Sequence, residues 1–126
     1  MSRKKAYVPK SFESIGGNNL SANLYATMLQ SEAYLDLSKN AMVLYQYMKL
    51  QYYGAKCIPG HASTDFVFNK AMYTKVYPLY TNAAQFRKDR DMLISHGFIE
   101  YVECGKNMRT KSIYRFSDRW QYWHKT

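Results

Sequence analysis

The chain has 126 residues, 47% of them hydrophobic, which fits one folded domain and excludes a disordered tail. Its 18 lysines and arginines against 9 aspartates and glutamates give a net charge of +9, which favours a polyanionic partner such as a nucleic acid or an anionic membrane surface. No apolar run approaches the roughly 20 residues that span a bilayer, and the basic N-terminus lacks the apolar stretch of a signal peptide, so we expect a cytoplasmic protein without a membrane partner.

The chain is predicted to begin with a flexible basic arm over residues 1–20, followed by one folded domain over residues 21–126. Arg3, Lys4 and Lys5 stand in the arm with no acidic residue beside them. A flexible basic arm can follow the minor groove of DNA. A disordered end that only aids solubility is the alternative.

Two short helices are predicted between the arm and the longest helix. One spans residues 21–30, and Ser31 can cap the other, which continues through Leu35.

The longest predicted helix begins at Ser38, whose hydroxyl can cap the first turn, and ends at Gly54. Apolar residues recur along it at the i, i+3, i+4 spacing of one buried face. Val43, Tyr47 and Leu50 add a second apolar face, and a helix that is apolar on two sides is typical of the centre of a domain. The first face consists of Ala41, Leu44, Tyr45, Met48 and Tyr52.

A loop, a short strand and a second helix are predicted next. Proline, glycine and small polar residues place 55–64 in a loop, and the apolar residues 66–68 favour a strand. Asn69 can cap a helix that ends before Pro78, because the residue before a proline avoids the α region. Its inward residues are Met72, Tyr73 and Val76.

A third helix is predicted to reach His96, with Thr81 and Asn82 as alternative N-caps. Gly97 is well placed as the residue that follows a helix C-terminus, and His96 as a cation at that end. The inward stripe comprises Phe86, Leu93 and Gly97, with Asp89 and Arg90 at its edges.

A β-hairpin and a short helix complete the predicted elements. The strands cover residues 98–102 and 112–116 and flank a basic, glycine-led loop, and Ser117 can cap the last helix. The aromatic C-terminus suits either closure of the core or a contact in a homodimer. Its aromatic residues are Trp120, Tyr122 and Trp123.

We expect neither an enzyme nor a metal or other cofactor. Cys57 and Cys104 are far apart, and Cys57 with His61 lacks a second ligand pair. The 13 tyrosines stand mostly at helical or strand spacing, without the supporting groups of a catalytic nucleophile.

The predicted order of helix, strand, helix, turn, helix, strand, basic loop and strand is an α+β order. The stretch TNAAQFRKDRDMLISHGFIEYVECGKNMRTKSIYRFS resembles the third helix and wing of winged helix-turn-helix DNA-binding proteins, with residues 93–99 at the helix-to-wing junction. Upstream, LQSEAYLDLSKNAMVLYQYMKLQYY resembles small proteins and replication-initiator N-terminal domains of plasmids and conjugative elements of Gram-positive bacteria. The resemblance covers residues 28–117, and Pro78 departs from it.

The resemblance implies a winged helix with a three-helix core, a β-hairpin wing and N- and C-terminal extensions. It also implies a double-stranded DNA-binding protein of a mobile genetic element, acting in replication, in conjugative transfer at an origin or in transcription control, with partner proteins of a replication or transfer complex. The alternative is a winged-helix module that binds another protein and has no intrinsic DNA specificity.

Candidate DNA contacts come from the third helix, the wing and the arm. The spacing points Ala84, Lys88, Asp91 and Ser95 away from the core, and the first half of the helix would enter a major groove, where glutamine can recognise adenine and lysine guanine. The candidates are Thr81, Asn82, Gln85, Arg87 and Lys88 from the helix, Lys106, Asn107, Arg109 and Lys111 from the wing, and Arg3, Lys4 and Lys5 from the arm.

Overall fold

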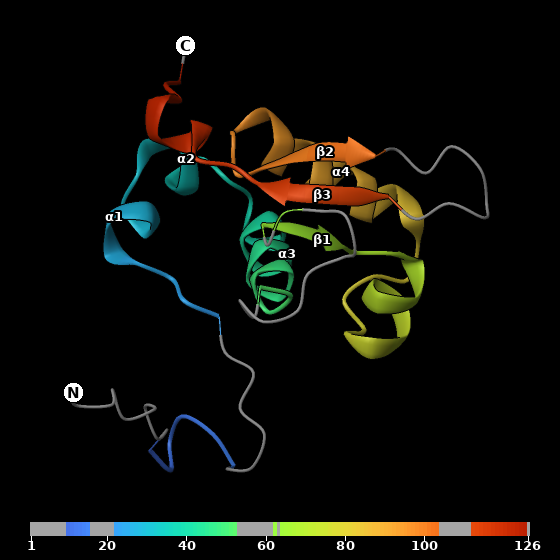
Figure 1. Ribbon diagram of the computed structural model, residues 1–126. Helices are drawn as coiled ribbons and strands as arrows, with labels where there is room; N and C mark the ends of the chain where they lie inside the picture. Colours follow the sequence, from blue (N-terminus) through green and yellow to red (C-terminus); the bar gives the residue numbers. More distant parts are fainter. Residues whose placement is uncertain (1–9, 16–21, 53–61, 63, 104–111, 126) are drawn as a thin grey trace.

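Helices pack around one small sheet in the computed structural model, which describes residues 10–15, 22–52, 62, 64–103 and 112–125 (Figure 1). The predicted α+β class is confirmed. The elements follow in the order α1 (Ala26–Leu29), α2 (Glu32–Leu35), α3 (Lys39–Lys49), β1 (Asp65–Val67), the π-helical turn η1 (Met72–Val76), α4 (Ala83–Ser95), β2 (Ile99–Glu103), β3 (Ile113–Phe116) and the 3-10 turn η2 (Arg119–Tyr122).

α1 and α2 stand where two short helices were predicted, one over residues 21–30 and the other from Ser31 to Leu35. α1 is much shorter than predicted. Tyr25 stands at the N-cap of α1, where its side chain makes no capping hydrogen bond. Ser31 Oγ accepts a hydrogen bond from the Tyr34 amide at 3.2 Å and begins α2. The chain therefore breaks at the well-capped serine.

The start of α3 is set by a side-chain cap. Ser38 Oγ accepts a hydrogen bond from the Ala41 amide at 3.2 Å, which confirms Ser38 as the N-cap. The helix ends earlier than predicted, because the amides of Gln51 and Tyr52 bond carbonyls three residues back, at 2.9 and 3.1 Å, and so tighten the last turn. Gly54, the predicted end, lies outside the described residues.

The inward face of α3 lies at the centre of the core. Tyr52 was predicted on this face and is exposed, because the helix has ended before it. On the second apolar face, Tyr47 packs on Tyr77 with ring centroids 5.0 Å apart, whereas Val43 is exposed. The buried residues of the inward face are Ala41, Leu44, Tyr45 and Met48.

The sheet has three antiparallel strands in the order β1-β3-β2. Arg115 in β3 stands opposite Asp65 in β1, and its Nε lies 2.7 Å from the carboxylate. The register of β2 against β3 shifts between Tyr101 and Glu103, as in a β-bulge. All three predicted strands are confirmed to within a residue at each end.

η1 stands where a helix between Asn69 and Pro78 was predicted. Asn69 Oδ1 accepts a hydrogen bond from the Met72 amide at 3.1 Å, which confirms the predicted cap. The Tyr77 amide then donates to the Met72 carbonyl at 2.8 Å, five residues back, which is the bond of a π-helix. Tyr73 is buried, but Val76 is 62% exposed, so its predicted place in the core is wrong. The wider π turn carries Val76 further round the axis from Tyr73.

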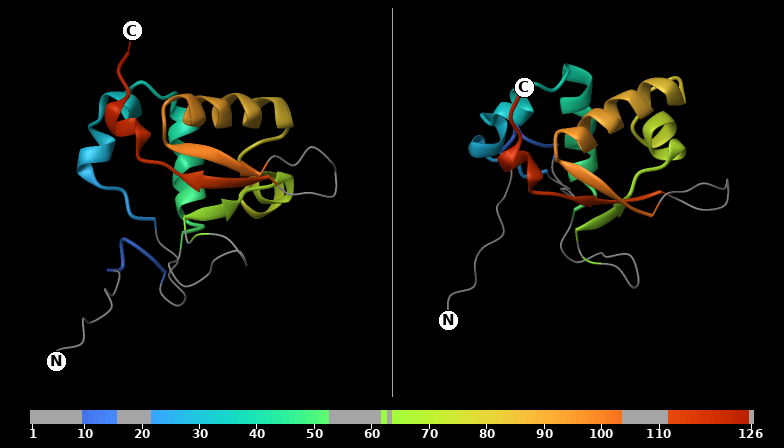
Figure 2. Two further views of the ribbon diagram at one scale, coloured as in Figure 1. Left: turned by 45° about the horizontal axis from the view of Figure 1, so that its top comes forward. Right: turned by 90° about the horizontal axis from the view of Figure 1, so that it is seen from above.

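α4 packs across α3, and the two helices cross steeply (Figure 2). Asn82, rather than Thr81, is its N-cap. Phe86 and Leu93 are buried as predicted. Gly97 has a φ of 85°, the left-handed conformation that favours glycine after a helix.

After β3 the chain returns to the C-terminal end of α4. The Trp120 amide donates to the Gly97 carbonyl at 3.1 Å. A Cβ at residue 97 would lie 2.6 Å from the Trp120 nitrogen, closer than real contacts allow. The close approach of two backbones therefore requires glycine at this position as strongly as the positive φ does.

The C-terminal aromatic residues differ in their packing. Trp120 and Trp123 pack against the core, as one of the two interpretations predicted, while Tyr122 is 74% exposed. Ser117 Oγ accepts a hydrogen bond from the Arg119 amide at 3.2 Å, but the predicted helix up to Trp123 is only the 3-10 turn η2.

The Leu93→Ala variant should lose about 2–5 kcal/mol of unfolding free energy, because it removes buried methyl groups and leaves a cavity. Leu93 is fully buried, whereas Lys88 of the same helix is exposed. Urea denaturation of Leu93→Ala and the control Lys88→Ala would measure the difference. Equal midpoints for both variants would show that the α3–α4 contact carries little of the stability.

Candidate nucleic-acid interface

The predicted DNA contacts that the structure describes all belong to α4 or to the two residues before it. Phe86, Asp89 and Leu93 are the buried residues of the helix, so its rotation agrees with the predicted inward stripe. The opposite face is exposed as predicted, and it comprises Ala84, Gln85, Arg87, Lys88, Asp91 and Ser95.

The N-terminal end of α4 uses one predicted contact residue as its cap. Asn82 Oδ1 accepts a hydrogen bond from the Gln85 amide at 2.9 Å, so this oxygen is occupied within the protein. The exposed side chain keeps its NH₂ group as a donor for an outside acceptor. Thr81 and Gln85 are exposed beside it. Polar hydrogen-bonding groups therefore cluster at the start of the helix.

The charges of the outer face are predominantly positive. Arg87 and Lys88 are exposed, and Arg87 lies close enough to Tyr73 of η1 to act on its pKa, which burial nevertheless raises. Asp91 is paired with its neighbour Arg90, whose Nη2 lies 2.9 Å from the carboxylate. This pairing neutralises the acidic group of the face and leaves the positive charge of Arg87 and Lys88 exposed.

A buried acid that was predicted at the edge of the stripe fixes α4 to the turn before it. Asp89 is 3% exposed, and its Oδ2 accepts a hydrogen bond from the Tyr80 hydroxyl at 2.7 Å. Burial first, and then the hydrogen bond to the carboxylate, raise the pKa of Tyr80. Spacing alone places residue 89 near Phe86, but nothing in it identifies Tyr80 as the partner.

η1 lies beside the N-terminal end of α4 (Figures 1 and 2). Lys70, two residues before η1, and Lys75 within it are exposed, and neither was among the predicted contacts. The signal for them was available, because lysines are rarely buried without a partner.

The other predicted contacts cannot be placed. The wing residues Lys106, Asn107, Arg109 and Lys111 and the arm residues Arg3, Lys4 and Lys5 lie outside the described residues. The structure does show the strands on either side of residues 104–111. β2 ends and β3 begins at the end of the molecule where α4 begins (Figure 2).

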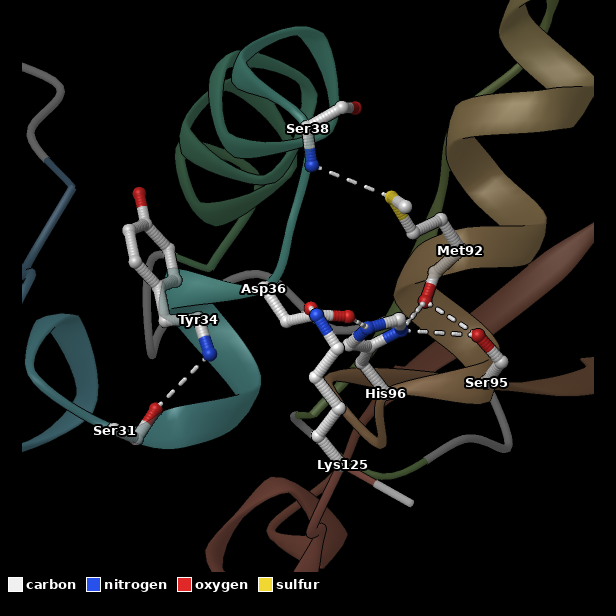
Figure 3. Close-up of polar contacts among 8 residues, drawn as sticks. All are labelled: Ser31, Tyr34, Asp36, Ser38, Met92, Ser95, His96 and Lys125. Carbon is white, nitrogen blue, oxygen red and sulfur yellow. Dashed lines mark hydrogen bonds and ion pairs between the residues drawn. The ribbon is translucent and has the colours of Figure 1, made fainter.

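A serine, a histidine and an aspartate meet at the other end of α4 (Figure 3). His96 Nε2 lies 2.8 Å from Asp36 Oδ2, and its Nδ1 lies 2.8 Å from the Met92 carbonyl oxygen and 3.0 Å from Ser95 Oγ. The Ser95 hydroxyl also points at the Met92 carbonyl, at 2.9 Å. These are the residue types of a hydrolytic triad, but here the serine and the histidine both cap the last turn of the helix.

The same histidine ties together three segments. Its ring stacks on Trp123 with centroids 4.4 Å apart, and Lys125 lies 3.2 Å from Asp36. Both ring nitrogens lie within hydrogen-bond distance of oxygen atoms, so the ring joins the last turn of α4 to Asp36. Hydrogen bonds from His96 and then Lys125 hold the pKa of Asp36 below its ordinary value.

No protein-family model, curated protein or solved structure matches the chain. The resemblance to winged-helix proteins therefore stays a prediction from the residues.

None of the helices in the described ranges is long and apolar enough to cross a membrane. Those ranges also hold no group of three or more histidine, cysteine, aspartate or glutamate side chains that could bind a metal, while Cys57, His61 and Cys104 lie outside them.

Tyr80→Phe should lower the unfolding free energy by about 1–3 kcal/mol, because a buried carboxylate would lose its hydroxyl donor. Tyr122→Phe makes the same chemical change at an exposed site and should leave stability unchanged. Thermal or urea melts of the two variants would measure the effect. A Tyr80→Phe protein as stable as the control would mean that Asp89 is satisfied without Tyr80.

Asp36 should contribute stability at neutral pH that disappears in acid. Its pKa in the folded protein lies below its ordinary value of 3.8, so the contribution is complete above that value and is lost as the pH falls through the folded pKa. Urea midpoints measured from about pH 5 downward should therefore fall more steeply for the native protein than for Asp36→Asn. Parallel curves would contradict the role given to Asp36.

Proposed function

We propose that the chain is a winged-helix protein that binds double-stranded DNA, with α4 in the major groove and the β2–β3 hairpin against the backbone or minor groove. The exposed, polar and basic outer face of α4 carries the proposal. Its partners would be the phosphates and base edges of a duplex, and the net charge of +9 favours such a polyanion.

The arrangement of the elements supports this proposal. The element order α3, β1, η1, α4, β2, β3 and the sheet order β1-β3-β2 are compatible with the three helices and the sheet of a winged helix. The steep crossing of α3 and α4 leaves one whole side of α4 uncovered (Figure 2). A helix held in this way can insert its N-terminal half into a major groove.

The residues suit two different tasks. Gln85 and Lys88 are candidates for base edges, because glutamine pairs with adenine and lysine with guanine. Arg87, together with Lys70, Lys75 and the wing cations, would contact phosphates. The resemblance to proteins of plasmids and conjugative elements further suggests replication, transfer or transcription control of a mobile element as the setting.

Salt dependence tests the proposal most directly. If about five cations meet phosphates, the logarithm of the affinity for random duplex DNA should fall with the logarithm of salt concentration at a slope near −4 to −5. Anisotropy titrations with a labelled duplex at several salt concentrations would give the slope. A slope near zero, or the absence of binding at low salt, would contradict DNA binding and favour a module that binds protein.

Alanine variants separate base recognition from phosphate contact. After selection of bound duplexes from a random pool, Gln85→Ala and Lys88→Ala should each cost ~1–3 kcal/mol at the selected site and relax base preference. Arg109→Ala and Lys111→Ala should weaken selected and random DNA alike. Ser95→Ala, at the far end of the same face, is the control. Lost base preference in the wing variants alone would transfer recognition from α4 to the wing.

A further inference from the structure

A second site lies on a part of the molecule that α4 does not line. A cleft of about 680 Å³ opens between α1, the C-terminal end of α3 and the junction of β3 with η2. Figures 1 and 2 show α1 and η2 on the same side of α3. The volume of the cleft falls within the range of roughly 300–1,000 Å³ that is usual for small-molecule sites.

Lys49 is the unusual group of this cleft. Its side chain is half-buried, and burial lowers its pKa. Its ammonium group lies 5.1 Å from the ring centroid of Tyr52 and 5.2 Å from that of Phe116. Among the described residues no carboxylate forms an ion pair with it. A partly desolvated cation whose contacts among the described residues are two aromatic faces would gain from an anion in the open cleft.

Three aromatic side chains give part of the cleft wall an apolar character. Tyr45, Phe116 and Trp120 line the cleft, and Trp120 is held in place by stacking on Phe98 with ring centroids 6.1 Å apart. Tyr25 stands at the rim and is 68% exposed. Such walls bind an apolar body through its area and through ring stacking. They give the cleft an apolar side next to its cation.

The remaining charges of the cleft limit the charge of the ligand. Arg119 is 3.8 Å from Glu100, and Asp118 is a further acid in the lining. Two cations, Lys49 and Arg119, therefore stand against two acids. This balance disfavours a polyanion such as a nucleic acid and favours an anion with one charge, placed at Lys49.

We propose that this cleft binds a small organic anion with a single charge and a flat apolar body, such as an aromatic carboxylate or sulfonate. Lys49 pairs with the anionic group, and Phe116 and Trp120 contact the rings. The site is separate from the outer face of α4, and its ligand belongs to a different chemical class from DNA.

Binding of 1-anilinonaphthalene-8-sulfonate, a fluorescent aromatic anion, tests the proposal. The native protein should bind it saturably with one site, and Lys49→Met should weaken binding about tenfold or more because a charge-assisted contact is lost. Lys49→Arg should retain most of the affinity, and Lys39→Met, an exposed lysine of the same helix, should match the native protein. Equal affinity in Lys49→Met, or no binding to the native protein, would overturn the proposal.

Two further measurements keep the test decisive if Lys49→Met does not fold. N-phenyl-1-naphthylamine has the same rings without the sulfonate, and it should bind the native protein at least about tenfold more weakly. Amide chemical shifts of the native protein should change at the cleft, around Lys49 and residues 117–121, when the anion is added. Shifts confined to α4, or equal affinity for the neutral compound, would overturn the proposal.

Discussion

The burial of one face of α4 is the constraint on which the rest of the structure depends. Phe86 stacks on Tyr73 at 4.1 Å between ring centroids, and Leu93 is fully buried further along the helix. Rotating the helix would expose these residues and push Lys88 inward, and an unpaired buried charge costs several kcal/mol. Stability and the outward presentation of Gln85 and Lys88 therefore depend on the same packing.

Local signals allowed most of the elements to be predicted from the sequence. Ser38, Asn69 and Asn82 each accept a hydrogen bond from an amide three residues on, and the positive φ of Gly97 stands where a helix terminator was expected. Caps and apolar spacing act within a few residues, so they can be recognised without the fold. The exposed side of α4 was predictable for the same reason.

Long-range contacts could not be predicted in this way. His96 meets Asp36 across 60 positions, and the Lys49 cleft is built from segments before, within and after the sheet. The π turn displaced Val76 from the core because one extra residue changes the rotation that an α-helical pattern assumes. Asp89 was expected only at the edge of the inward stripe, and its hydroxyl partner becomes evident only in three dimensions.

The place of β3 in the middle of the sheet has a consequence for biosynthesis. β1 and β2 are both hydrogen-bonded to β3 and not to each other, yet β3 is the last of the three strands to leave the ribosome. Until residues 113–116 emerge, the nascent chain carries two strands with unpaired edges, and such edges recruit other chains. The helices α3 and α4 are complete by then and can pack first. Vectorial folding would thus proceed from a helical intermediate to a sheet that closes in one late step.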